Sequence, residues 1–208
     1  MAINSDADIC NMALGHLGNY GTVSSIETPE TDIERTFALW FGVSRETLLK
    51  LVMPNFALAR IRAGRVTDYV ADSTEGYSYA YQKPNDMLKL LGIGSADIKD
   101  NSYSVEGEYI ITDELYPTGA YLRYIKNVKD VSKWSAEFKD LQALYLAAKT
   151  CLPITQDAVK QQALNAQLQT AMMTVSAINA QENRPVIRNT SRFRQSRYDG
   201  FVSEDIKR

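Results

Sequence analysis

This 208-residue chain has few of the residue types that build metal and catalytic sites. It contains one histidine, His16, and two cysteines, Cys10 and Cys151, which lie far apart in the sequence. A metal site needs several ligands at characteristic spacings, and a catalytic triad would have to use His16 without the residues that usually surround a nucleophile. The glycines of "GHLGNYG" and "LGIGSAD" match neither a dinucleotide fingerprint nor a phosphate loop. We therefore expect no catalytic residues, no metal, no cofactor and no enzymatic activity.

The same three residues have structural roles that we favour. His16 lies on the apolar side of a predicted helix, where a packed, half-buried histidine is far more common than a general base or a ligand. Cys10 and Cys151 fit reduced thiols in a hydrophobic core. Long apolar runs are also missing, which excludes a predicted transmembrane helix, and the first ten residues lack the basic and apolar regions of a signal peptide.

Hydrophobic periodicity predicts an α+β, mainly α fold. The expected helices span about residues 5–19, 28–53, 132–152 and 155–183. Ser5 and Asp8 resemble a capping pair, Thr28 and Ser132 are expected to cap the second and third helices, and Pro153 is expected to end the third. We predict a helical bundle built from the N- and C-terminal helix pairs within a domain of residues 1–184. A small antiparallel β insertion interrupts this domain at about 65–128, and residues 185–208 form an extended C-terminal arm.

The β insertion is rich in tyrosine. Tyr77, Tyr79 and Tyr81 alternate along one expected strand, which indicates an aromatic face. Such a face can stack nucleic-acid bases, but base stacking favours interleaved lysine and arginine, and residues 70–125 contain few of either. Packing in a core or at an interface is the interpretation we prefer. The residues expected at an interface, with another subunit or another protein, are Tyr77, Tyr79, Tyr81, Tyr103 and Tyr109.

The C-terminal segment differs from the rest of the chain in charge. The whole chain has a net charge of −2 and residues 184–208 contribute +4, so residues 1–183 carry −6. Five arginines and no acid lie between Arg184 and Arg197, without helical periodicity beyond Pro185. Arginine pairs with carboxylates through two parallel hydrogen bonds, and aromatic residues among the arginines would act as anchors. The predicted docking arm contains Arg184, Arg188, Arg192, Phe193, Arg194, Arg197 and Tyr198.

Four strings in order give the chain a resemblance to a known family. They are "ICNMALGHLG", "LLKLVMPNFALAR", "YSYAYQKPNDMLKLLGI" and "NAQENRP". Together they resemble the head-to-tail adaptors of short-tailed bacteriophages, the tail tubular protein A or gatekeeper family, over about residues 7–190. The tryptophan that usually stands next to the "PNF" asparagine in this family is absent, and Met53-Pro54 stands there instead.

The resemblance implies a structural virion protein of the tail connector, made in the host cytoplasm. Family members form a ring of twelve subunits that joins the portal protein to the tail nozzle protein and extends the DNA channel. Their outer helices and C-terminal arms dock onto the portal, and their β part faces the tail. DNA passes through such a ring without sequence-specific binding. The alternative is a nucleic-acid-binding protein that uses the arginine-rich arm, which the acidic body disfavours.

Overall fold

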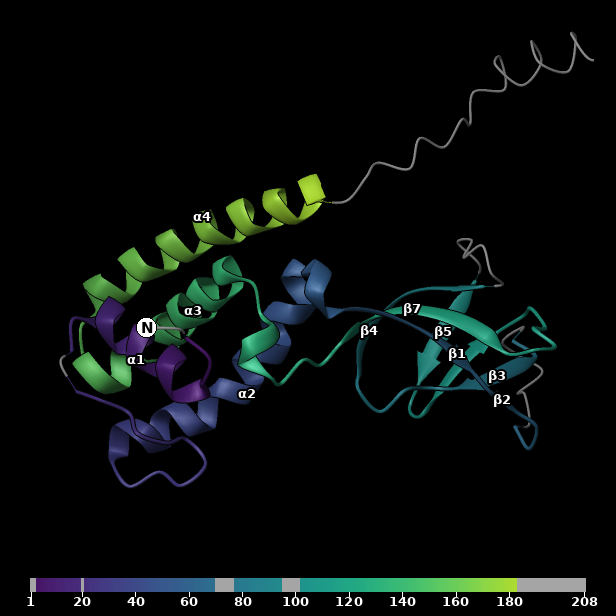
Figure 1. Cartoon of the computed structure of the whole chain (residues 1–208), viewed down its shortest axis with the longest axis horizontal. Helices are drawn as coiled ribbons and strands as arrows, with labels where there is room; N and C mark the ends of the chain where they lie inside the picture. The colour runs from purple at the N-terminus through teal and green to yellow at the C-terminus, as the bar shows by residue number, and fades with distance from the viewer. Residues whose placement is uncertain (1–2, 20, 70–76, 95–101, 183–208) are drawn as a thin grey trace, which may run out of the picture.

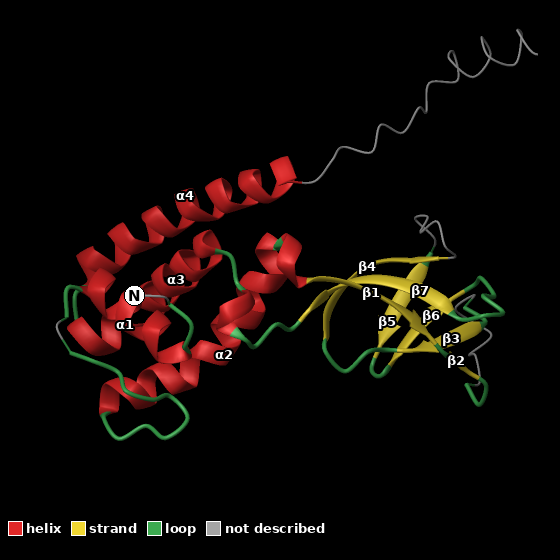
Figure 2. Cartoon of the chain, in the orientation of Figure 1, coloured by secondary structure: helices red, strands yellow, loops and turns green. Residues whose placement is uncertain are grey.

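The computed structural model describes residues 3–19, 21–69, 77–94 and 102–182. Within these residues the chain forms a helical bundle and a protruding β unit (Figures 1 and 2), so the predicted α+β, mainly helical fold is confirmed. The helices are α1 (Asp6–Leu17), α2 (Asp32–Val52), α3 (Ala136–Thr155) and α4 (Ala158–Glu182). The helices that precede the β unit and those that follow it belong to one bundle, because α3 packs against α1, α2 and α4.

Residues from all four helices form the core of the bundle. Phe37, Phe41 and Leu48 from α2 pack around Phe138 and Leu141 of α3, and all of these side chains are buried. Trp134 precedes α3, and its ring packs edge-on against Phe138 with centroids 5.2 Å apart. The apolar face of α4 is narrower, because only Leu164, Leu168 and Val175 are buried in this helix. The helix α4 is therefore held mainly through α3.

The helix ends show which capping predictions were right. The capping box of Ser5 and Asp8 is present at the start of α1. The second helix begins three residues later than expected from Thr28, because Thr31 and Glu34 form the capping box of α2. Ser135, not Ser132, accepts the capping hydrogen bond of α3. Pro153 does not end that helix, which continues to Thr155, so the proline removes one backbone donor within the final turn.

The β unit contains two antiparallel sheets. The first has the order β1-β7-β4 and the second has the order β2-β3-β6-β5. The strands are β1 (Leu58–Ala63), β2 (Arg65–Val66), β3 (Tyr79–Gln82), β4 (Met87–Gly94), β5 (Tyr103–Glu106), β6 (Tyr109–Thr112) and β7 (Ala120–Lys126). The turn predicted at Glu106-Gly107 joins β5 to β6, and Gly107 adopts a φ of 56° there. This positive φ favours glycine at that position.

The first strand of the β unit was missed in the sequence. We predicted the insertion from about residue 65 and expected a short helix or loop before it, whereas β1 begins at Leu58, directly after a short 3₁₀ helix at Asn55–Ala57. The insertion also holds two sheets, which its small predicted size did not indicate. The two sheets enclose a core of their own, which includes Tyr81, Ile93, Ile110 and Leu122.

Side-chain hydrogen bonds join the β unit to the bundle where β7 ends. Asn127 accepts a hydrogen bond from Arg45 Nε at 3.3 Å and donates one to Glu46 Oε1 at 2.8 Å. The backbone N–H of Asn127 also donates to the carbonyl of Asp86 at 2.8 Å, just before β4. Ile125 of β7 is buried in the core of the bundle. The attachment of the β unit therefore combines a polar bridge with an apolar contact.

Candidate subunit interface

The helix α2 exposes apolar side chains opposite its buried face. Leu39, Val43 and Leu51 retain 70%, 58% and 56% of their accessible surface. Positions 39, 43, 47 and 51 are four residues apart, so they lie along one side of a helix, and Trp40 flanks this line with 36% of its surface exposed. We call Leu39, Trp40, Val43 and Leu51 the α2 stripe. A contiguous exposed apolar patch of this kind is typical of a surface that another molecule covers.

Helical spacing of the apolar residues in 28–53 predicts that Leu51 shares one buried face with Phe37 and Leu48, and for Leu51 this prediction is wrong. The side chains that face the core are Phe37, Phe41 and Leu48, whereas Leu51 points to solvent. The helix carries apolar residues on two sides, so periodicity alone does not tell which side the rest of the chain covers. The sequence does indicate the second face, because α2 contains more apolar residues than one buried face needs.

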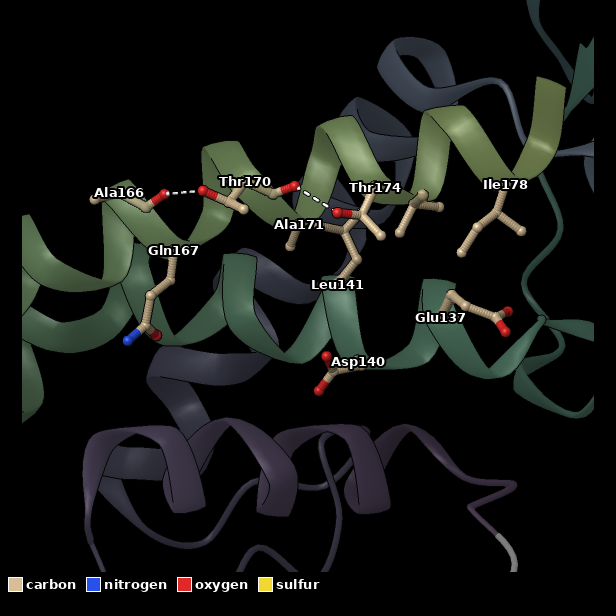
Figure 3. A pocket seen from close by; sticks show the side chains of 10 residues that line it. Glu137, Asp140, Leu141, Ala166, Gln167, Thr170, Ala171, Thr174 and Ile178 are labelled. Carbon is tan, nitrogen blue, oxygen red and sulfur yellow. Dashed lines mark hydrogen bonds between the residues drawn. The ribbon is translucent and has the colours of Figure 1, made fainter. Parts of the chain in front are cut away.

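A groove lies between α3 and α4, and we call it the α3–α4 groove (Figure 3). Its volume is about 580 Å³. Leu141 of α3 and Ala171, Val175 and Ile178 of α4 form apolar parts of its lining, and the carboxylates of Glu137 and Asp140 come from α3. Figure 3 shows Leu141 between the ribbons of the two helices and Ile178 pointing from α4 toward α3, whereas Asp140 points away from α4, toward α1.

The two threonine hydroxyls of the α4 wall are satisfied within the helix. The hydroxyl of Thr170 donates to the carbonyl of Ala166 at 3.3 Å, and the hydroxyl of Thr174 donates to the carbonyl of Thr170 at 3.0 Å (Figure 3). These threonines therefore need no polar partner from an occupant of the groove. An apolar side chain can enter here without leaving a hydroxyl unpaired.

The groove continues toward the end of α4. A second cavity of about 260 Å³ shares Glu137, Val175 and Ile178 with the first. Phe56 and Trp134 also line it, and its far end is reached at Glu182. The two cavities together form a trough along the C-terminal half of α4, on the side that faces α3.

The exposed surface of α4 carries almost no charge. Residues 161–181 contain no aspartate, glutamate, lysine or arginine, although most of them are exposed. Exposed helices usually carry charged residues on the solvent side, and the cores of protein interfaces are depleted of them. Met173, with 74% of its surface exposed, adds an apolar side chain to this face. The composition of α4 therefore favours an interface in which this helix becomes covered.

The α2 stripe and α4 belong to different sides of the bundle. In the view of Figures 1 and 2, α4 runs along one edge, the first half of α2 lies at the opposite edge, and α3 lies between them. Both helices pack against α3, which separates them over most of their length. One chain therefore presents a convex apolar stripe on one side and a concave groove on another.

The predicted tyrosine interface is only partly available. Tyr79 and Tyr103 pack partly against the core of the β unit, and the Arg65 guanidinium lies 5.0 Å from the centroid of the Tyr79 ring. Tyr77 is half-buried, and its hydroxyl lies 3.3 Å from Ser102 Oγ. Tyr109 keeps 37% of its surface exposed and packs against Tyr69. An interface role for these four residues stays a prediction.

Tyr81 is not available to a neighbouring subunit, so its assignment to the interface is corrected. Its side chain is fully buried, and its hydroxyl accepts a hydrogen bond of 2.7 Å from the backbone N–H of Tyr116. Burial raises the pKa of this hydroxyl. The alternation along β3 was predicted correctly, but the aromatic face points between the two sheets instead of toward solvent.

The histidine and the cysteines have the packing roles that we favoured. His16 is half-buried, with Nε2 3.5 Å from Asp140 Oδ1 at the edge of the α3–α4 groove. Cys10 and Cys151 are free and buried, and burial raises the pKa of Cys10 to about 12. Among the residues that the structure describes, no group of three or more histidine, cysteine, aspartate or glutamate residues is placed to hold a metal ion.

The predicted docking arm lies outside the described residues. This applies to Arg184, Arg188, Arg192, Phe193, Arg194, Arg197 and Tyr198. None of the described helices is long and apolar enough to cross a membrane. Neither the protein-family models nor the curated protein sequences with which the chain was compared match it.

Proposed function

We propose that this chain is a ring-forming structural protein of a virion, which joins the portal to the tail of a short-tailed bacteriophage and extends the DNA channel. The observation that carries the proposal is the pair of uncovered surfaces on the bundle, the α2 stripe and the α3–α4 groove. The resemblance of the four sequence strings to head-to-tail adaptors agrees with this role.

The occupant that we assign to the α3–α4 groove is the α2 stripe of a second copy. The stripe is apolar, and the α4 wall of the groove carries small and apolar residues together with two threonines whose hydroxyls are already bonded. Gln167 and the carboxylates of Glu137 and Asp140 complete the lining, so the apolar contact is made along the α4 wall and Leu141. Two different surfaces on one chain form a head-to-tail contact, which builds a ring when the rotation between copies closes. With twelve copies each step turns by about 30°, so the two surfaces must face nearly opposite directions. Figure 1 places α4 and the first half of α2 at opposite edges of the bundle, which supports this arrangement.

The remaining parts of the chain have roles in the same proposal. The arginine-rich segment after α4 docks onto an acidic surface of the portal, and the β unit meets the tail nozzle protein. Many weak arms acting together bind far more tightly than one, because each later contact forms at high effective concentration. Deletion of residues 185–208 should therefore leave a folded chain that no longer attaches to the portal. A chain that attaches normally after this deletion would contradict the role of the arm.

Electron microscopy and mass measurement test the proposal directly. The purified chain is imaged alone and mixed with the portal of the same phage, and the expected result is a ring bound to the portal. Images that show only bare portals would refute an adaptor function.

A matched pair of variants tests the interface within this assay. Thr170→Arg with Thr174→Arg places two charges in the groove, whereas Gln162→Arg with Gln169→Arg places two charges on exposed positions of α4 outside the groove lining. The first pair should prevent ring formation and the second should permit it. Equal assembly by both pairs would remove the groove from the interface.

A further inference from the structure

The outer face of the sheet β1-β7-β4 changes character along its length. Leu58 and Ile125 lie opposite each other and pack against the core of the bundle. Two residues farther out on the same face, Arg60 lies opposite Arg123. The pair after that is Arg62 and Tyr121. The part of this face that the helices leave uncovered is therefore basic, and we call Arg60, Arg62, Tyr121 and Arg123 the basic sheet face.

The arginines of this face have no acidic partner in the described part of the chain. None of the ion pairs there includes Arg60, Arg62 or Arg123. Like charges directly across a strand pair destabilise a sheet, so the pairing of Arg60 with Arg123 costs the fold free energy. The Nε atom of Arg123 is buried without a hydrogen-bond partner, which is a second cost. An anion on this face would offset the repulsion between Arg60 and Arg123.

The third strand contributes no side chain beside these arginines, and its two glycines there are buried. The residues of β4 opposite Arg123 and Tyr121 are Gly92 and Gly94. Neither glycine places a side chain beside the basic sheet face, and glycine in a strand often marks a close approach of another backbone. The three arginines come from two strands of one sheet, so they form a flat group with about 7 Å between Arg60 and Arg62 along the strand.

The chemistry of the face distinguishes between two kinds of polyanion. A protein partner usually binds through an aromatic or aliphatic anchor that fills a pocket. The aromatic ring on this face is that of Tyr121, and the Arg62 guanidinium covers it at 4.9 Å from the ring centroid. The same cover disfavours stacking of nucleic-acid bases on Tyr121. What remains is a set of guanidinium groups, of which that of Arg62 also donates a hydrogen bond to Thr118 Oγ1 at 3.2 Å. Guanidinium groups set at this spacing suit a regular line of phosphates.

We propose that the basic sheet face binds the phosphate backbone of double-stranded DNA without reading its sequence. This site is separate from the arginine-rich C-terminal segment, and the inference does not need the ring, because one chain carries all three arginines. The site could not be recognised from the sequence, because Arg60 and Arg62 lie in a strand that we did not predict. Only the pairing of β1 with β7 brings them beside Arg123 and Tyr121.

The test measures the salt dependence of binding to a fluorescent DNA duplex of arbitrary sequence. Each phosphate contact contributes about −0.9 to the slope of log K against log salt concentration. The triple variant Arg60→Gln, Arg62→Gln, Arg123→Gln should therefore lower the magnitude of the slope by about 2–3. The matched control is Lys50→Gln, Lys129→Gln, Lys149→Gln, which removes three exposed positive charges elsewhere and should leave the slope almost unchanged.

Three results would overturn the proposal. An unchanged slope in the arginine triple variant would assign all DNA contacts to the C-terminal segment. An equal loss in both triple variants would mean general attraction without a site. Binding of polyglutamate that matches DNA in strength and is lost in the arginine variant would assign the face to an acidic protein partner.

Two further measurements exclude unfolding as the explanation. The arginine triple variant should be as stable as the unmodified chain or more stable, because it relieves the cross-strand repulsion. In the unmodified chain, the NMR signal of the Arg123 Nε–H group should shift when the duplex is added. A signal that stays in place at saturating DNA would refute contact at this residue. Neither readout depends on ring formation, so failure here is distinguishable from failure of the adaptor function.

Discussion

Truncation of the α2 stripe should separate assembly from stability. In the double variant Leu39→Ala, Val43→Ala, the removed carbons belong to side chains that are 70% and 58% exposed in the single chain. Folding of the single chain therefore removes little of their surface from water, and these carbons contribute little to its stability. Alanine also has a higher helix propensity than valine. The free energy of unfolding should fall by only about 1 kcal/mol.

Assembly should respond more strongly, because the next copy buries what the chain alone leaves exposed. At about 0.8 kcal/mol per buried methylene, the exposed share of the removed carbons corresponds to about 2–2.5 kcal/mol per interface. This is a loss of about 30–60-fold in the affinity between copies. Sedimentation velocity over a concentration series measures this affinity, and urea denaturation measures the stability.

Leu48→Ala on the opposite side of α2 is the control. Leu48 is fully buried, so its truncation should lower the stability by about 2–5 kcal/mol. The double variant should therefore lose affinity between copies and keep most of its stability, whereas the control should lose stability. If the double variant assembles as tightly as the unmodified chain, the α2 stripe is not an interface and the reasoning from its exposure fails.

Three other predictions concern buried groups. Hydrogen bonds from Ser24, Thr31 and Glu30 hold the pKa of Glu34 below its ordinary value. The ionised carboxylate therefore stabilises the fold fully above about pH 4.3, and this stabilisation is lost as the pH falls toward the folded-state pKa. Thermal unfolding between pH 3 and 7 should depend less on pH in Glu34→Gln than in the unmodified chain, and an identical pH dependence of the two would contradict this. Tyr81→Phe removes the acceptor of the Tyr116 N–H and should cost about 1–3 kcal/mol in denaturant unfolding, while a loss of assembly at unchanged stability would return Tyr81 to the interface. Cys10, whose pKa burial raises to about 12, should react with a disulfide reagent at pH 8 only as fast as the chain unfolds; rapid labelling of the folded chain would show that the thiol is accessible.

The elements with a complete local signal were predictable. The capping box at Ser5 and the last helix, expected at about 155–183 and found at Ala158–Glu182, each depend on residues close in sequence, and each lies where the sequence placed it. Errors arose where two local signals competed. Thr28-Pro29 and Thr31 with Glu34 both resemble helix starts, and the choice of Thr31 brings Glu34 within hydrogen-bonding distance of Ser24.

The candidate surfaces required tertiary information. Leu51 has the same chemistry whether it faces the core or solvent, so only the placement of α3 decides which side of α2 is covered. Tyr81 shows the reverse case, because the second sheet covers a face that the alternation suggested was open. The arginines of β1 and β7 are about sixty residues apart in sequence. No local pattern connects them, and strand pairing alone makes them neighbours.

The way in which the β unit joins the bundle has a mechanical consequence. The chain enters the unit through β1 and leaves it through β7, and Leu58 and Ile125, at the bundle end of these strands, are directly paired. A force that pulls the unit away from the helices therefore divides between two adjacent backbones that are loaded in the same direction. Neither strand slides past the other, so the ladder of hydrogen bonds between them is not sheared. Both strands therefore share axial tension, and the hydrogen bonds of Asn127 with Arg45 and Glu46 cross the same junction and bear part of it.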